Sequence, residues 1–265
     1  MLNSMQISWA GQMPGGHRVP GIMRFDVTDR PGKVTSIPDT LRGSAGKPAV
    51  LPPLPKATVE PVNHTLNVNI NPRGMLMTWL MMNIDNLMFD SPDVDVAHQG
   101  TVQQWNLINT DPTIQTHSIH IHVAQFRVLG RQDFDQLGFM FKEGFPLTVG
   151  SRWAPSAESY ASGPLQPPAP YEAGWKDTVR CPRGQITRVL VRWPSAAELG
   201  FDPDAPFVGP DGTKLRGYVW HCHMLDHEDH EMMRRFRLVD PRTPQSDLTM
   251  PMDDDMDMSS GHGHG

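Results

Sequence analysis

Short stretches of alternating apolar and polar residues, separated by proline and glycine, restrict the fold of this chain more than any other feature. Residues 64–70, His-Thr-Leu-Asn-Val-Asn-Ile, alternate with a period of two, which predicts a half-buried β-strand. We expect similar strands over residues 101–109, 120–129, 185–193 and 217–223. Helical periodicity is scarce, and residues 195–199 are the best candidate for a short helix. Several short strands with turns between them predict an all-β Greek-key sandwich or barrel.

The amino-acid composition agrees with this fold class. The chain of 265 residues contains 26 Pro and 23 Gly, and only 38% of its residues are hydrophobic, which favours turns and loops over long helices. A net charge of −6 predicts no binding to nucleic acid or to an anionic membrane. No apolar run approaches the roughly 20 residues of a membrane span. Residues 1–15 lack the basic start and apolar core of a signal peptide, and the localisation is left open.

The chain divides into three zones. Residues 1–49 contain one convincing strand, residues 21–27, followed by a stretch that is typical of a linker. Because a single strand cannot bury its apolar face alone, we interpret this zone as the last strand of a preceding domain. Residues 50–240 are expected to form a domain of successive strands, with a loop inserted over 194–216. Residues 241–265, rich in Met, Asp, Gly and His, are predicted to be a disordered tail.

Six of the 12 histidines fall in two short clusters about a hundred residues apart. The members of the two clusters are His117, His120, His122, His221, His223 and His227, with Cys222 between His221 and His223. Chance scatter would rarely produce such a grouping. We interpret the isolated His17, His64 and His98 as ordinary core residues, and Cys181 as a free or buried thiol.

Strand geometry predicts how the two clusters are arranged. Alternate side chains of a β-strand share a face, so His120 and His122 point one way and His117 can point the other way. The two histidines that flank Cys222 share a face, and the cysteine takes the opposite face. If the two strands are neighbours, four imidazoles converge on one side of the sheet, and Cys222 meets His117 on the other side.

The side that carries Cys222 matches the ligand set of a blue-copper electron-transfer site. A loop after the cysteine can return His227 and Met232 to the same place, which gives two His, one Cys thiolate and a weak axial Met. Met233 is the alternative axial group. The four-imidazole side suits copper that binds oxygen, because nitrogen ligands stabilise both copper oxidation states. Single peptide units join Cys222 to both flanking histidines, so an electron can pass from the cysteine side to the four-imidazole side through the backbone alone.

These residues also allow two other interpretations. Zinc also uses Cys and His in tetrahedral sites, but a zinc site calls neither for Met232 nor for a second histidine set across the strand. Glu228 and Asp229 directly follow His227. They are either a solvated acidic loop, or Glu228 acts in catalysis as a carboxylate that relays protons or hydrogen-bonds a ligand.

The same residues resemble the multicopper oxidase family. Residues 117–122 look like its His-Pro-x-His-x-His motif, with Ser118 in place of the usual Pro, and residues 221–233 match its C-terminal signature. The likeness is nearest to bacterial spore-coat laccases, bilirubin oxidases and phenoxazinone synthases, and it covers most of residues 21–240. It implies a C-terminal cupredoxin domain, preceded by the end of the family's middle domain.

The resemblance also implies which residues bind which copper ion. Type 1 copper is expected to be bound by His117, Cys222, His227 and Met232. Type 2 copper is expected to be bound by His120, and the type 3 pair by His122, His221 and His223. The type 1 set is complete, whereas in the family half of the type 2 and type 3 ligands come from an N-terminal domain with two His-x-His motifs.

Nothing before His117 offers a His-x-His pair, and the pair His262 and His264 lies in a glycine run that we expect to be flexible. We therefore expect a laccase-like oxidase of phenolic or similar donors that needs an N-terminal multicopper oxidase domain, in the same chain or another, to reduce oxygen. The alternative is a stand-alone blue-copper protein that only transfers electrons. An electron carrier would need none of the four surplus histidines, and this favours the oxidase.

Overall fold

The computed structural model describes residues 43–44, 47–48, 50–70, 80–113, 115–209, 212 and 214–248. The chain separates into two units, Met1–Leu54 and Pro55–Gly265. In the first unit, β1 (Gly43–Ser44) pairs with β2 (Lys47–Pro48). The strand predicted over residues 21–27 and most of the predicted tail lie outside the described residues, and the three predicted zones stay a prediction.

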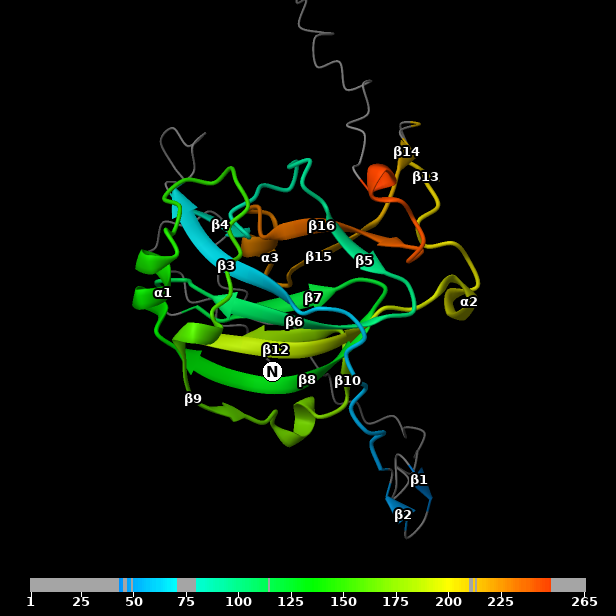
Figure 1. Cartoon of the computed structure of the whole chain (residues 1–265), viewed down its shortest axis with the longest axis horizontal. Helices are drawn as coiled ribbons and strands as arrows, with labels where there is room; N and C mark the ends of the chain where they lie inside the picture. Colours follow the sequence, from blue (N-terminus) through cyan, green and yellow to red (C-terminus); the bar gives the residue numbers. More distant parts are fainter. Residues whose placement is uncertain are drawn as a thin grey trace, which may run out of the picture. The chain divides into compact units, whose positions relative to one another are not determined.

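The larger sheet of the second unit has the strand order β10-β8-β12-β6-β3-β4, with β9 paired to β8 (Figure 1). Its strands are β3 (Val62–Ile70), β4 (Leu80–Ile84), β6 (Val102–Asn109), β8 (Gln125–Phe134), β9 (Ala161–Gln166), β10 (Trp175–Lys176) and β12 (Gln185–Arg192). β12 pairs antiparallel with both β6 and β8, and β3 runs parallel to β6. Strands β3, β6 and β12 confirm the strands predicted over 64–70, 101–109 and 185–193.

The smaller sheet has the strand order β11-β7-β15-β16-β5. Its strands are β5 (Asp95–His98), β7 (His117–Ile121), β11 (Thr178–Cys181), β15 (Tyr218–Cys222) and β16 (Met233–Val239). β7 and β15 are antiparallel neighbours, with His221 opposite His120 and Cys222 opposite Ile119. The two histidine clusters therefore lie on adjacent strands, which is the condition on which the predicted arrangement depended.

Aromatic side chains from both sheets meet in the core. The ring of Trp105 on β6 lies 4.9 Å from that of Trp220 on β15 and 5.5 Å from that of Trp193. Phe236 on β16 lies 5.2 Å from Trp193, and all four side chains are buried. His64 packs against Trp105 and Trp220, as expected for a core histidine. Two sheets packed through their side chains form a β-sandwich, so the prediction of an all-β fold is confirmed.

An ion-pair network anchors β15 next to the second histidine cluster. The guanidinium of Arg152 lies 3.1 Å from Asp85, 2.7 Å from Asp93 and 2.7 Å from Asp95. Asp95 in turn accepts a hydrogen bond of 2.8 Å from the indole N–H of Trp220, the residue before His221. Because Arg152 neutralises the buried carboxylates of Asp85 and Asp95, the network is a structural element that fixes the strand.

The structure corrects the prediction of a single strand over residues 120–129. β7 ends at Ile121, and β8 begins at Gln125 in the other sheet. Between them Val123 has a φ of 57°, which is rare for a β-branched residue. The chain crosses from one sheet to the other in this corner. Apolar residues on both sides of the corner are buried, so the sequence pattern continues through it and hides the break.

Helices are few and short in the described part of the chain. They are α1 (Gln136–Lys142), α2 (Ala196–Leu199), α3 (Leu225–Glu228) and the 3-10 turns η1 (Glu158–Tyr160), η2 (Pro170–Glu172) and η3 (Gln245–Asp247). α2 confirms the predicted helix, whereas α1 was not predicted. The loop predicted over 194–216 also contains a small hairpin of β13 (Phe207–Val208) and β14 (Lys214–Leu215). No helix among the described residues is long and apolar enough to span a membrane.

Candidate metal centre

The first group of potential ligands consists of His117, Cys222 and His227, which we call the thiol cluster. The Sγ atom of Cys222 lies 3.8 Å from Nδ1 of His117 and 3.6 Å from Nδ1 of His227. The two Nδ1 atoms are 3.1 Å apart, and all three side chains are buried. The structure thus brings together three residues that the sequence assigned to one site, on the face that strand alternation predicted.

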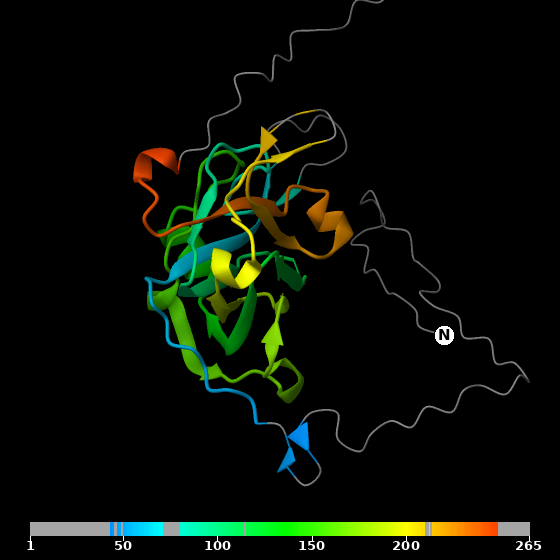
Figure 2. The ribbon, with the colours of Figure 1, turned by 90° about the vertical axis from the view of Figure 1, so that its right-hand side faces the viewer.

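The loop after Cys222 returns the chain to the thiol cluster. α3 follows directly from the end of β15 (Figure 2) and carries His227. The N–H of Met232 donates to the carbonyl of His227 at 3.0 Å, and the N–H of Cys222 donates to the carbonyl of Met232 at 3.0 Å. The side chain of Met232 is fully buried. The fourth residue predicted for this site therefore lies on a closed loop beside the other three.

Asp111 contacts the thiol cluster, although the sequence pattern did not predict it as a site residue. Its Oδ2 atom lies 3.1 Å from Nε2 of His117, and the N–H of Thr113 donates to Oδ1 at 2.7 Å. Burial alone would raise the pKa of the Asp111 carboxyl, but the hydrogen bonds from His117 and Thr113 hold this pKa below its usual range. A carboxylate at Nε2 keeps the ring proton there, so the lone pair of Nδ1 faces Cys222. The Asp-Pro sequence at 111–112 signals only a turn.

Burial sets the protonation of the thiol cluster. It raises the pKa of Cys222 to about 11, although backbone N–H groups of Met224 and Ser118 hydrogen-bond to the sulfur and lower this pKa in part. Burial also lowers the pKa of His227 to about 4, and the nearby His117 acts in the same direction. Both groups are therefore neutral at neutral pH in the absence of a cation. A bound cation would displace the thiol proton.

The second group is the histidine face, which we define as His120, His122, His221 and His223. Ring centroids of neighbouring members lie between 5.1 and 5.5 Å apart. The Nε2 atoms of His122 and His221 are 3.3 Å apart. His221 is buried, whereas His223 is exposed. The four imidazoles meet on one side of the sheet, as strand alternation predicted.

Two of these imidazoles have hydrogen-bond partners at Nδ1. Nδ1 of His120 lies 2.9 Å from the carbonyl oxygen of Asp177, and Nδ1 of His221 lies 3.1 Å from a carboxylate oxygen of Glu228. Each partner accepts the Nδ1 proton and leaves Nε2 free as a ligand. For Glu228, the contact supports hydrogen bonding to a ligand. The proton-relay role stays a prediction.

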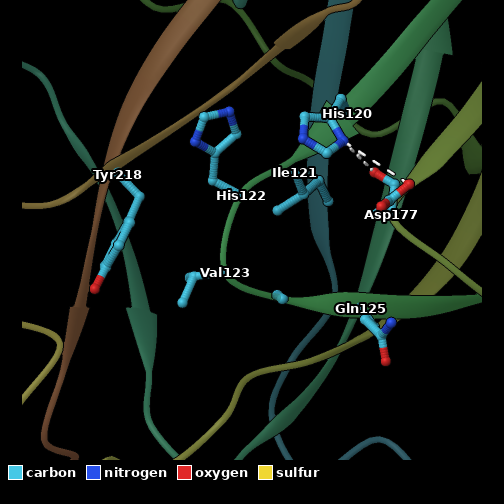
Figure 3. A pocket seen from close by; sticks show the side chains of 8 residues that line it. His120, Ile121, His122, Val123, Gln125, Asp177 and Tyr218 are labelled. Atoms are coloured by element: carbon cyan, nitrogen blue, oxygen red, sulfur yellow. Dashed lines mark hydrogen bonds and ion pairs between the residues drawn. The ribbon is translucent and has the colours of Figure 1, made fainter. Parts of the chain in front are cut away.

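A cleft of about 500 Å³ opens beside the histidine face. Figure 3 shows Asp177 next to His120, with Tyr218 on the other side of His122. Val123, at the corner between the two sheets, also lines the cleft. The histidine face is therefore accessible through this cleft, whereas the thiol cluster is buried.

Comparison with known proteins identifies the family. The profile of the family described as multicopper oxidase matches residues 59–242. The chain is 36% identical over 158 residues to a laccase of Bacillus subtilis (strain 168), a match that covers 60% of this chain and 24% of the laccase. It is 31% identical over 157 residues to the multicopper oxidase LPR1 of Arabidopsis thaliana, which covers 59% of this chain and 26% of that protein. The chain belongs to the multicopper oxidase family.

Among solved structures, the McoA multicopper oxidase of Aquifex aeolicus aligns with a TM-score of 0.44 and 20% identity, over 72% of this chain and 32% of that chain. The matches span about a quarter of the length of the curated relatives. Family membership confirms the resemblance stated from the sequence. It implies copper as the metal, and an electron donor and oxygen as reactants of the family.

Proposed function

We propose that this chain is the copper-binding C-terminal portion of a laccase-like oxidase that oxidises phenolic or similar donors with oxygen. The thiol cluster and Met232 would hold type 1 copper. His120 would bind type 2 copper, and the other three members of the histidine face would bind the type 3 pair. One observation carries this proposal: Cys222 on β15 faces a buried cluster, while the histidines on either side of it face the opposite way.

The residues of both groups fit copper. In the thiol cluster, two imidazole nitrogens and one thiol sulfur lie within 4.8 Å of one another in a buried site. With Met232 as a further donor, this set would match the ligands of a blue-copper site. The histidine face offers imidazole nitrogens alone. Bound copper would supply one-electron redox chemistry at both sites.

The protein's own residues would prepare both sites. Asp111 orients His117 through its ring N–H, and Glu228 orients His221 in the same way. Burial of Cys222 excludes water from the thiolate. Cys222 and His221 are consecutive residues of β15. One peptide unit therefore connects the thiol cluster with the histidine face.

We propose that an N-terminal multicopper oxidase domain, in the same chain or another, supplies the remaining type 2 and type 3 ligands. The cleft beside His120 and His122 supports this, because it leaves room for further side chains. The exposure of His223 also supports it. So does the length of the relatives, of which the matched region is about a quarter.

Oxygen consumption tests the proposal. The purified chain, loaded with copper, is expected to show a blue absorption band but to consume no oxygen with a phenolic donor. Addition of a polypeptide that carries the family's two His-x-His motifs is expected to start turnover. A chain that reduces oxygen alone would contradict the need for that partner. A blue chain that stays inactive with such a partner would favour the stand-alone electron carrier.

A further inference from the structure

Glu231, which the proposed mechanism does not use, has an unusual backbone conformation next to a proposed copper ligand. Its φ is 75°, and it is one of four non-glycine residues in the described chain with a positive φ. This left-handed region is normally occupied by glycine or asparagine. The next residue is Met232, so the unusual conformation lies directly before a proposed copper ligand.

The left-handed residue belongs to a turn that ends α3. Met232 donates its N–H to the carbonyl of His227, five residues earlier, at 3.0 Å. A bond of this span, with a left-handed residue just before the donor, is the longer of the two bonds of the Schellman arrangement of a helix end. In that arrangement the side chains of the two bonded residues commonly pack together. Here those two residues are His227 and Met232, so the turn itself brings two proposed type 1 ligands to one place.

The side chain of Glu231 adds a contact that glycine could not make. Its Oε2 atom accepts a hydrogen bond of 2.7 Å from the backbone N–H of Phe89, which is 142 positions away in the sequence. Phe89 is itself held, because the guanidinium of Arg235 lies 5.7 Å from its ring and donates to the carbonyl of Ser91 at 2.9 Å. The carboxylate therefore ties the ligand loop to a segment that β16 already fixes.

We propose that Glu231 is a positioning residue for the type 1 site, whose backbone turns the chain and whose carboxylate fixes the loop that presents Met232 beside His227. The inference rests on the proposed copper site. It explains why glutamate occupies a left-handed position that glycine would adopt with less strain. Glycine would form the turn but could not make the side-chain hydrogen bond to Phe89.

Three substitutions in the full chain separate the role of the turn from that of the tether, by which we mean the hydrogen bond between the Glu231 carboxylate and the N–H of Phe89. Glu231→Gly keeps the turn and removes the tether, and Glu231→Asn also tolerates the left-handed conformation but is too short for the contact with Phe89. Glu231→Gln keeps the length and an acceptor oxygen. Asp229→Asn is the matched control, because it removes one charge from the same loop at an exposed position. Circular dichroism checks the fold, and the visible and electron paramagnetic resonance spectra report copper bound to the Cys222 thiolate.

We expect Glu231→Gly and Glu231→Asn to remain folded, to bind Cu(II) at the thiolate about tenfold more weakly, and to change the shape of both spectra. Glu231→Gln and Asp229→Asn should resemble the unmodified chain. If the two tether-free variants match the unmodified chain in affinity and spectra, or if Asp229→Asn produces the same change, the inference is wrong. If the unmodified chain shows no thiolate–copper band, the proposed function itself fails.

Discussion

The thiol cluster and the histidine face occupy the same two strands but differ in how they are enclosed. His117 and Cys222 are completely buried, whereas His120 keeps 21% of its side chain exposed and His223 is exposed. On one face, the described residues bring three donor side chains together, and the backbone of Met232 hydrogen-bonds to two of them. On the other face, two of the four imidazoles, those of His120 and His122, line an open cleft. Opposite faces of one strand pair therefore differ in enclosure, one holding a buried group of donors and the other a more exposed one.

The difference in burial has a chemical consequence. A buried cluster of neutral donors holds its geometry before the metal arrives, since the surrounding core fixes each side chain. An open set of imidazoles can be completed by side chains from elsewhere. We therefore expect substitutions on the buried face to alter the spectrum of the blue-copper site strongly, and substitutions on the open face to leave that spectrum unchanged.

The largest effect is expected from removal of the thiol. Cys222→Ser should abolish the blue band, because the covalent copper–sulfur bond that defines such a site is lost. Cys181→Ser is the matched control: Cys181 is equally buried, and it lies opposite His117 on β11. Visible absorption of both copper-loaded variants checks this. A band that survives in Cys222→Ser, or disappears in Cys181→Ser, would refute the assignment.

A smaller effect, a partial loss of copper affinity, is expected from substitution of Asp111, which contacts His117. Asp111→Ala removes the acceptor at Nε2 and should weaken copper binding at the thiol cluster by about 10- to 100-fold, the usual effect of losing an outer-shell partner. Asp111→Asn keeps an acceptor oxygen and should bind copper more tightly than the alanine variant. Competition with a copper chelator, read at the blue band, measures both. Equal affinities for the alanine variant and the unmodified chain would show that Asp111 orients nothing.

Substitution of Ser118 is expected to shift the reduction potential of the site without loss of copper. Its backbone N–H hydrogen-bonds to the Cys222 sulfur, and proline has no such donor. Hydrogen bonds to the cysteine sulfur tune the reduction potential. Ser118→Pro should lower the potential, because the thiolate then donates more charge to copper. Ser118→Ala keeps the N–H and should leave the potential unchanged. Redox titration of the blue band distinguishes them, and a fall in both variants would mean that the hydroxyl is responsible.

The smallest effect on the blue site is expected from the open face. His122→Ala should leave the blue band intact, since His122 points away from Cys222. Glu228→Gln should also keep the blue colour, although in a completed oxidase it should slow turnover because Glu228 contacts His221. Absorption of the isolated chain and turnover of the completed oxidase check these expectations. Bleaching by His122→Ala would mean that the two faces are not separate.

The sequence predicted the two faces because strand alternation depends only on local geometry. It could not predict the break at Val123, since the corner is set by the passage between two sheets and both flanking segments are buried. The contact between Glu231 and Phe89 was equally hidden, because it joins positions 142 residues apart. Asp111 lies close to His117 in the sequence, but only the fold turns its carboxylate toward the ring.

A copper titration of the full chain can show whether the two faces bind copper independently. We expect that one copper per chain develops the blue band of the Cys222 site. Further copper should produce no near-ultraviolet absorption of a coupled type 3 pair until His-x-His ligands are supplied. A near-ultraviolet band from the chain alone, or copper binding at Cys222 without the blue band, would contradict the claim that one strand separates a complete site from an open one.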